Sequence, residues 1–424
     1  MAPTNLPSPS RQTGALSHLR VLDLSRVLAG PWCTQNLADM GADVIKIEKP
    51  GTGDDTRHWG PPYLDGADGP TNQASYFAAC NRNKRSVTVD IATPEGQKLV
   101  RDLAAQSDVV IENYKTGSLK RYGLDYETLS ALNPRLIYCS VTGFGQTGPY
   151  ATRPGYDLLV QAMSGLMSIT GQPDGTPGAG PMRVGVAVID VFTGMYATTA
   201  ILGAIEARHH TGRGQSIDIA LLDVAMAVLA NQGAGFLNAG VVPTRQGNVH
   251  PSVVPYQDFP TRDGDMLLAI GNDGQFARFC EVADVDWARD ARYTTNSARV
   301  ANRDTLIPMM CDITRTKPTS EWIHLLEAAT VPCGPINDIG QAFADEHVQS
   351  RELRVEQFRY AEGSGVSDPV NRVCSTASPL RLSDTPPTLR HAPPALGQHT
   401  DEVLRECLGL DGDAVAGLRA RGVL

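Results

Sequence analysis

Asp190 is the residue whose setting in this sequence most clearly suggests covalent chemistry. It lies in the string GVAVIDVFTGMY (185–196), between a small apolar, β-like run and a long Ala-rich segment of helical character. No other Asp, Glu, Lys, Arg or His occurs from residue 185 to residue 204. A carboxylate in apolar surroundings at a helix N-terminus is poorly hydrated, while the backbone dipoles favour its anion. That setting suits a nucleophile, and the alternative interpretation of Asp190 as an N-cap stays open.

Other polar clusters could also bind ligands. GTGDDTRHW (51–59) follows an expected strand and contains Arg57 and His58. Loops at that edge of an open α/β sheet commonly hold ligands, so this one is a candidate site. NRNKR (81–85) is expected to be a solvated basic face or part of a phosphate-attracting rim. His209 and His210 end the Ala-rich helix, where solvated positive charge would complement the helix dipole.

The string GFGQTG (143–148) matches the dinucleotide-binding pattern G-x-G-x-x-G but lacks its context. That pattern needs a helix to begin at the third glycine, whereas Pro149 and TRPGYD (152–157) follow here. The first βα turn, SRVLAGP (25–31), has one glycine. These features disfavour a nicotinamide or flavin oxidoreductase. No string of the form G-x-x-x-x-G-K-[ST] points to phosphoryl transfer either.

Composition narrows the class of protein further. The chain has 424 residues and a formal net charge of -9, which argues against a nucleic-acid or anionic-membrane surface. Its eight cysteines include no C-x-x-C pair and no Cys/His spacing typical of metal sites, so we expect reduced thiols and no metal. No apolar run reaches the length of a membrane span, and the N-terminus lacks the apolar core of a secretory signal. We expect a cytoplasmic protein and leave organelle targeting by the leader open.

The elements that must position these residues alternate between strand and helix. We expect helices near Pro31, at Pro94 after Thr93 as N-cap, and over 126–132. Successive βαβ units predict an α/β fold with a Rossmann-like parallel sheet. Strands are expected at 19–24, 42–48, 85–91, 108–113 and 135–141.

We predict two domains with one interruption of the larger domain. The second domain is expected to be a smaller α+β domain, because the pattern loosens after residue 222 into mixed short runs. The predicted divisions are a flexible leader at 1–17, the large domain at 18–221, a linker at 222–246, the small domain at 247–330, and a return linker with the C-terminal part of the large domain at 331–424.

Several strings together resemble the class III CoA-transferase family (CaiB/BaiF type). The resemblance runs from about residue 18 to the C-terminus, and the set is specific although each string alone is weak. The strings are VLDLSRVLAGP (21–31), GADVIKIEKPGTGD (41–54), NRNKRSVTVD (81–90), ENYKTG (112–117), GFGQTGP (143–149), GYD (155–157), GVAVIDVFTGMY (185–196), TGRGQ (211–215) and LGQHTDEVL (396–404).

The resemblance places the family's catalytic aspartate on Asp190 through the D-x-x-T-G match. It implies that this carboxylate attacks an acyl-CoA thioester to give a mixed anhydride, which CoA converts to an aspartyl-CoA thioester. An acceptor acid then takes CoA through a second anhydride. CoA thioesters are therefore expected as substrates, with no permanently bound cofactor. The implied CoA contacts are Val27, Leu28, Ala29, Lys49, Val89, Asn113, Tyr114 and Arg121, of which Lys49 and Arg121 would meet phosphates and Tyr114 the adenine.

The strings look closest to the succinate–hydroxymethylglutarate CoA-transferase subgroup. That subgroup implies succinyl-CoA as donor and a short dicarboxylate as acceptor. The distal carboxylate of the acceptor needs a cationic or donor-rich partner, for which the candidates are Arg57, His58, Arg153 and His250. The family also implies an interlocked homodimer.

Two alternative activities come from the same superfamily. α-Methylacyl-CoA racemases pair the aspartate with a histidine in a G-H-D string, and Tyr156 takes that position here, which removes one acid/base group. The second alternative is a formyl-CoA:oxalate or carnitine type of CoA-transferase. Against the oxalate type, Leu28 stands where that enzyme has glutamine, and no run of consecutive glycines occurs in the second domain.

Overall fold

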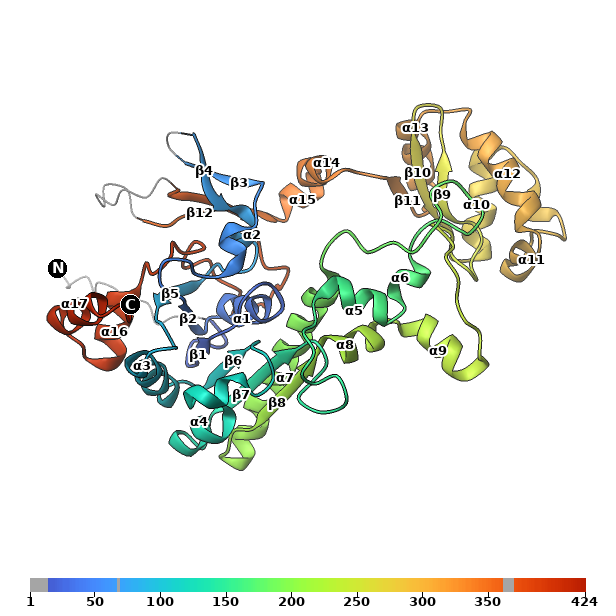
Figure 1. Ribbon diagram of the computed structural model, residues 1–424. Helices are drawn as coiled ribbons and strands as arrows, with labels where there is room; N and C mark the ends of the chain where they lie inside the picture. Colours follow the sequence, from blue (N-terminus) through green and yellow to red (C-terminus); the bar gives the residue numbers. More distant parts are fainter. Residues whose placement is uncertain (1–13, 67–68, 361–369) are drawn as a thin grey trace, which may run out of the picture. The chain divides into compact units, whose positions relative to one another are not determined.

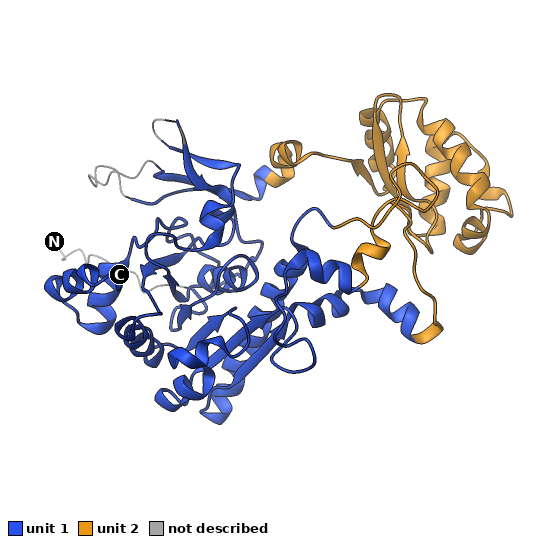
Figure 2. Ribbon diagram, in the orientation of Figure 1, with its two compact units in different colours: residues 1–164, 184–237, 349–424 blue, residues 165–183, 238–348 orange. Residues whose placement is uncertain are grey.

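The structure is a computed structural model that describes residues 14–66, 69–360 and 370–424 (Figure 1). The chain forms two compact units, which Figure 2 distinguishes by colour. The large unit contains residues 1–164, 184–237 and 349–424, and the small unit contains residues 165–183 and 238–348. Each unit is therefore assembled from separate stretches of the chain.

Six parallel strands form the centre of the large unit, in the order β5-β2-β1-β6-β7-β8. Numbered along the chain, this is the doubly wound order 3-2-1-4-5-6, in which the winding reverses between β1 and β6. The predicted Rossmann-like α/β fold and its five strands are confirmed, while the exposed edge strand β8 was missed. The bounds are β1 (Arg20–Asp23), β2 (Asp43–Glu48), β5 (Lys84–Thr88), β6 (Val109–Glu112), β7 (Ile137–Thr142) and β8 (Ser216–Ala220).

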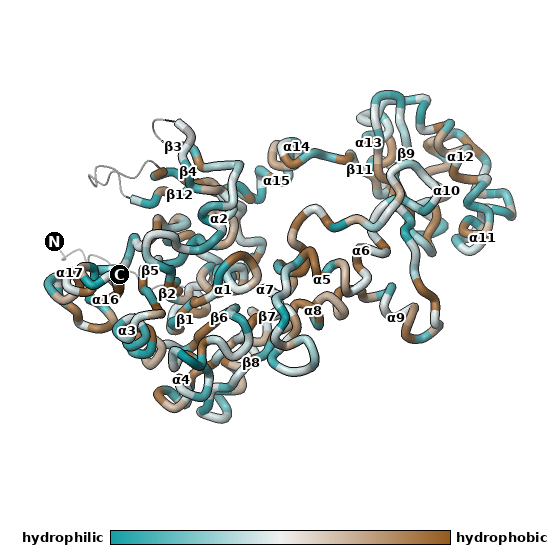
Figure 3. The backbone as a smooth tube through the Cα atoms, in the orientation of Figure 1, coloured by the Kyte–Doolittle hydropathy of each residue, from teal (hydrophilic) through white to brown (hydrophobic). Residues whose placement is uncertain are grey.

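Helices cover both faces of this sheet. One face packs against α3 (Pro94–Ala105), α4 (Tyr126–Leu132), α16 (Thr400–Leu408) and α17 (Gly412–Ala420). The other face lies under α1 (Ala29–Asp39) and α7 (Val188–Thr211). Much of the hydrophobic colour in Figure 3 follows the strands of this sheet and helix α5 (Asp157–Met163). The predicted start of α3 is confirmed, because the Thr93 hydroxyl accepts the backbone N–H of Gly96 at 3.0 Å.

The face under α1 and α7 carries buried charge. Side chains alternate between the two faces of a strand, so Asp23 of β1, Lys46 and Glu48 of β2 and Lys84 of β5 share this face. All four are at most 3% exposed. The expectation of a solvated basic face at NRNKR (81–85) is therefore wrong: every residue of this string is buried, and Lys84 pairs with Asp23.

The remaining elements of the large unit are short helices and hairpins. Helix α5 packs against α7 and α8 (Leu221–Val228). The other elements are η1 (Asp55–His58), β3 (Tyr63–Gly66), β4 (Gly69–Ala74), α2 (Ser75–Ala78), η2 (Ser118–Tyr122), α9 (Ala230–Ala239), β12 (Arg354–Phe358) and β13 (Arg372–Thr376).

The small unit is an α+β domain around an antiparallel sheet in the order β11-β10-β9. Its core includes Phe259, Phe279 and Trp322. Its elements are α6 (Leu166–Ile169), β9 (Tyr256–Pro260), β10 (Asp265–Ala269), α10 (Asp273–Ala283), η3 (Trp287–Arg289), α11 (Asn296–Ala301), α12 (Arg303–Thr314), α13 (Thr319–Ala328), β11 (Cys333–Pro335), α14 (Ile339–Ala344) and, at the unit boundary, α15 (Glu346–Ser350).

The observed units differ from the predicted divisions in three places. Residues 165–183, predicted in the large domain, belong to the small unit, so the large unit is interrupted twice and not once. The predicted linker at 222–246 contains most of α8 and all of α9, because α8 packs on α5 and α7 as part of the large unit. The return of the chain begins at 349 and not at 331, because β11 pairs with β10 of the small sheet.

The GFGQTG string (143–148) forms no dinucleotide-binding turn of the G-x-G-x-x-G type. No helix begins at Gly148, and Gly143 instead touches Gly155: a Cβ built on Gly143 would lie 2.5 Å from the Gly155 Cα.

Within the described residues, α7 alone is long and apolar enough to cross a membrane by length and composition. It packs against α1 and β7, so its apolar character also suits the core of the large unit.

Candidate active site

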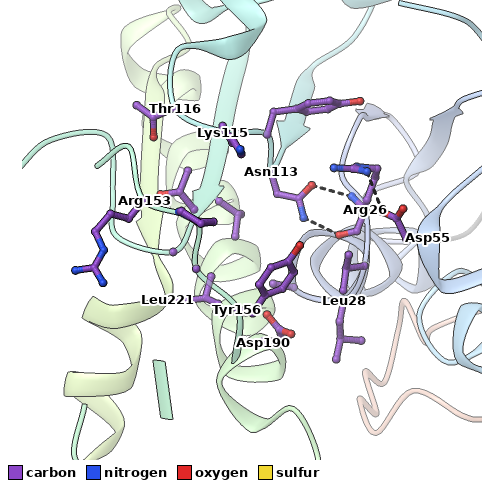
Figure 4. A pocket seen from close by; sticks show the side chains of 18 of the residues that line it. Arg26, Leu28, Asp55, Asn113, Lys115, Thr116, Arg153, Tyr156, Asp190 and Leu221 are labelled. Atoms are coloured by element: carbon purple, nitrogen blue, oxygen red, sulfur yellow. Dashed lines mark hydrogen bonds and ion pairs between the residues drawn. The ribbon is translucent and has the colours of Figure 1, made fainter. Parts of the chain in front are cut away.

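A cavity of about 350 Å³ lies in the large unit where the winding of the sheet reverses (Figure 4). Its walls come from the segments that follow β1, β6 and β7 and from the first turn of α7. Ligands of open α/β sheets characteristically bind at this place, beyond the carboxyl ends of the strands. The lining includes Arg26, Val27, Leu28, Ala29, Asp55, Trp59, Asn113, Tyr114, Lys115, Thr116, Thr142, Gly143, Arg153, Tyr156, Asp190 and Leu221.

Asp190 is the third residue of α7 and lines this cavity. The helix is preceded by Ala187 as N-cap, with no capping side chain of its own, so the N-cap interpretation of Asp190 is wrong. The β-like run expected before it forms no strand. The Asp190 carboxylate has no hydrogen bond or ion pair with any residue that the structure describes. It is thus a partly buried acid facing a cavity without a protein partner.

Asp157 of α5 takes the capping role. One of its carboxylate oxygens, Oδ2, accepts the backbone N–H groups of Ile189 at 2.8 Å and of Asp190 at 3.2 Å. Its other oxygen accepts a hydrogen bond from the Gln161 side-chain amide, whose own oxygen accepts the Val184 N–H at 3.0 Å. The first turn of α7 is therefore tied to α5 by a buried carboxylate that leaves Asp190 uncovered.

The same arrangement sets the acidity of Asp190. Burial raises the pKa of the Asp190 carboxyl to about 7, and the negative charge of Asp157 adds to the rise. From the sequence, the helix N-terminus is expected to hold Asp190 as an anion. The structure opposes this expectation, because Asp157 already accepts hydrogen bonds from the N–H groups of Ile189 and Asp190. A carboxylate close to half-protonated at neutral pH is poorly solvated, which makes its anion reactive.

A close crossing of two helices brings α1 to the same cavity. A Cβ built on Gly194 of α7 would lie 2.7 Å from the Ala29 carbonyl oxygen and 2.9 Å from the Trp32 Cβ. Only a residue without a side chain permits this approach. Asp190 lies one helical turn before Gly194, so the crossing places it beside Leu28 and Ala29 at the start of α1.

Five of the eight predicted CoA contacts line the cavity together with Asp190: Val27, Leu28, Ala29, Asn113 and Tyr114. Asn113 is fixed because its oxygen accepts the Arg26 N–H at 2.8 Å and its nitrogen donates to the Arg26 carbonyl at 2.6 Å. The other three do not line it. Val89 lies in the hydrophobic core, and Lys49 and Arg121 are exposed elsewhere, with the Arg121 guanidinium over the Tyr122 ring.

The predicted partners of the acceptor carboxylate are scattered. Arg57 makes two hydrogen bonds of 2.7 Å to Glu48 and, with His58, lines a separate cavity of about 390 Å³. His250 belongs to the small unit, where its ring packs on Tyr256. Arg153 lines the main cavity, but its side chain extends away from Asp190 and its guanidinium lies over the Tyr150 ring (Figure 4).

Several lining residues were missed as site residues by the sequence analysis, among them Tyr156, Trp59, Lys115 and Arg26. Tyr156, with 65% of its surface exposed, lies close to Asp190 in Figure 4, and Trp59 also lines the cavity. Lys115 adds a cation. Asp157 was missed as well, although its spacing of four residues from Gln161 predicts a side-chain contact on one helix face. No group of three or more His, Cys, Asp or Glu side chains suited to a metal occurs in the described parts of the chain.

Comparisons with known proteins identify the family of the chain. The model of the family described as CoA-transferase family III matches residues 16–400. A succinate–glutarate CoA-transferase of Agrobacterium fabrum is 51% identical over 392 residues, which are 92% of this chain and 95% of that protein. A human succinyl-CoA:glutarate CoA-transferase is 42% identical, with 96% and 90% covered. The crystal structure of a CaiB/BaiF family protein from Brucella suis has a TM-score of 0.82 at 45% identity, covering 93% of this chain and 100% of that one.

The raised pKa of Asp190 predicts a pH-dependent cost to folding. Between about pH 4 and pH 7 the folded chain retains a proton that the unfolded chain has released, so stability falls as pH rises through this window. Asp190→Asn removes that cost. We expect its thermal midpoint to exceed the wild-type value by an amount that grows from pH 4 to pH 7 and is constant above pH 7.5.

The measurement is differential scanning calorimetry across this pH range, with Asp65→Asn on the exposed strand β3 as the control for removing one acidic side chain. A constant difference between Asp190→Asn and wild type at every pH would show that Asp190 carries no such cost.

Proposed function

Because this chain belongs to CoA-transferase family III, we propose that it moves coenzyme A from succinyl-CoA to a short free dicarboxylate, with Asp190 as the covalent nucleophile. The observation that carries the proposal is the unpaired, partly buried Asp190 carboxylate in the cavity at the reversal of the sheet. Glutarate is the first acceptor to test, since the relatives named above are glutarate CoA-transferases.

The proposed reaction proceeds in four displacements. The Asp190 carboxylate attacks the succinyl thioester carbonyl, which expels the CoA thiolate and leaves an aspartyl–succinyl anhydride. The thiolate attacks the aspartyl carbonyl, which releases succinate and forms aspartyl-CoA. Glutarate attacks aspartyl-CoA and again expels the thiolate, and this thiolate attacks the glutaryl carbonyl of the new anhydride to give glutaryl-CoA and free Asp190. No net proton transfer is needed, so a nearby general base is not required.

The cavity supplies features that such a reaction needs. Arg26, Lys115 and Arg153 lie along its lining and offer cationic groups to the phosphates of CoA. The N-terminus of α1 faces the same space, where backbone N–H groups can stabilise oxyanions. We retain Val27, Leu28, Ala29, Asn113 and Tyr114 as proposed CoA contacts. Tyr156 at the position of the racemase histidine supports transfer over racemisation, because phenol is a much weaker base than imidazole.

We also propose that the protein works as a homodimer. Large apolar side chains remain exposed on four helices of the large unit, including Leu158 of α5, Phe192 of α7, Met226 of α8 and Leu237 of α9. Exposed apolar surface of this extent commonly marks an interface.

Transfer should depend on Asp190. Wild-type protein incubated with succinyl-CoA and glutarate should form glutaryl-CoA, and Asp190→Ala should lower the rate more than about a thousandfold. With succinyl-CoA alone, mass spectrometry of the wild-type peptide that contains Asp190 should reveal the CoA adduct. Further acceptors are 3-hydroxy-3-methylglutarate, itaconate, malate, oxalate and carnitine. Equal transfer by Asp190→Ala would contradict the proposed nucleophile.

The pH dependence of kcat/KM should reflect the pKa of Asp190 and the influence of Asp157 on it. Since the attacking group is an anion, kcat/KM for succinyl-CoA should rise with pH to a plateau with a midpoint near 7. Asp157→Asn preserves the shape of the cap but removes the charge that helps to raise the pKa of Asp190, so the midpoint should move to lower pH. An unchanged midpoint in this variant would mean that Asp157 does not tune Asp190.

The dimer is tested by light scattering after gel filtration. Wild-type protein should have twice the mass of the 45.4 kDa chain. Leu158→Glu/Leu237→Glu should shift it toward monomer, whereas Leu132→Glu on α4, 53% exposed on the other face of the sheet, should not. A monomeric wild-type protein would rule out this part of the proposal.

A further inference from the structure

The turn between β1 and α1 has a strained backbone. It comprises Ser25 to Leu28, and Arg26, Val27 and Leu28 line the main cavity. Val27 has a φ of 71°, in the left-handed region that β-branched residues strongly disfavour. Such a conformation persists only where the surrounding structure fixes it, and it is typical of functional sites.

The buried side chains of Lys46 and Asp54 hold this turn in place through hydrogen bonds. The Lys46 ammonium donates to the Ser25 carbonyl at 2.8 Å, and the Asp54 Oδ1 atom accepts the Val27 N–H at 3.2 Å. Lys46 and Asp54 also pair with each other at 2.9 Å. The turn is therefore held on both sides of Arg26 by one ion pair, in addition to the Asn113 contacts with Arg26 shown in Figure 4.

This ion pair is fully buried. The side chains of Lys46 and Asp54 are both 0% exposed, and opposite charge raises the pKa of Lys46 and lowers that of Asp54. Taking two charges out of water is costly, and replacing a buried pair by apolar residues is often neutral for stability. Besides its ion pair with Asp54, the one hydrogen bond of the Lys46 ammonium within the described residues is to the Ser25 carbonyl, while Asp23 and Glu48 act on it through their charge. The Lys46 ammonium therefore stabilises the turn more directly than it stabilises the core.

We propose that Lys46 and Asp54 are positioning residues for acyl-CoA binding: their buried pair holds the Ser25–Leu28 turn in the left-handed conformation at Val27 that shapes the cavity. The inference rests on the proposed function, because the ligand of the cavity is taken to be a CoA thioester. Without the pair, Val27 relaxes to a less strained conformation. Only the chains that keep the left-handed turn at Val27 then bind CoA well. The apparent dissociation constant for CoA is therefore multiplied by the inverse of the fraction of such chains.

The decisive variant is Lys46→Met/Asp54→Asn, which removes the anchor of the Ser25 carbonyl without leaving one buried charge unpaired. Titration calorimetry with free CoA should give a dissociation constant about tenfold above wild type, in line with the usual strain of such a residue. The KM for succinyl-CoA should rise similarly. The kcat at saturation should change less than about threefold, because bound substrate restores the turn.

A matched control variant separates positioning from general damage. The matched control is Arg82→Met/Asp39→Asn. That pair is buried to a similar degree, at 5% and 1% exposed, but contacts no residue of the cavity. It should lower the thermal midpoint and leave CoA affinity unchanged.

The outcomes distinguish the two proposals. If wild-type protein does not bind CoA, the proposed function itself fails. If wild type binds CoA and Lys46→Met/Asp54→Asn binds it equally well, the pair is merely structural and the positioning role is overturned. A loss of CoA affinity in Arg82→Met/Asp39→Asn as large as that in Lys46→Met/Asp54→Asn would also overturn it, because general loosening and not the lost turn conformation would then be the cause.

Discussion

The contact of Gly194 with the start of α1 is the constraint on which the candidate site depends. With no side chain at 194, helix α7 lies against the Ala29 carbonyl and Trp32, and Asp190 on the preceding turn reaches the carboxyl edge of the sheet. A side chain there would force the helices apart and carry Asp190 away from Leu28 and Ala29. The D-x-x-T-G string thus combines an acid with the glycine that places it.

The acidic side chains on the side of the sheet that α1 and α7 cover differ in whether they have a cationic partner. Asp23, Glu48 and Asp54 each have a cationic partner, and the pKa of each is lowered, to about 2 for Asp23. Asp190 is largely buried, has no cationic partner among the described residues and lies near Asp157, so burial and then the charge of Asp157 raise its pKa. The same contrast explains why Arg57 was a poor candidate for an acceptor site: its guanidinium is committed to Glu48.

Local patterns predicted most of the fold, and the chemistry of single residues predicted part of the site. Each of the five predicted strand segments contains several Val, Ile or Leu residues, and the Thr93–Pro94 start of α3 follows from capping. The resemblance identified five of the cavity residues around Asp190. The burial of NRNKR could not be predicted from composition, because its partners Asp23, Asp39 and Asp43 lie about 40 to 60 residues away in the chain. Asp157 was missed for the same reason: it caps a helix that begins thirty-one residues later.

The division of the large unit into three stretches of chain has a consequence for biosynthesis. The core on the α3 face combines Leu22 and Val110 from the first third of the sequence with Val403, Leu404 and Leu418 from its end. During translation, the sheet can form early with α3 and α4 on this face, but the part of the face that α16 and α17 cover stays open until those two helices have been synthesised. The small unit emerges in between and has a core of its own. Until α16 and α17 have been synthesised, the nascent chain exposes the apolar surface that Val403, Leu404 and Leu418 cover in the folded unit, and such transiently exposed surface favours aggregation.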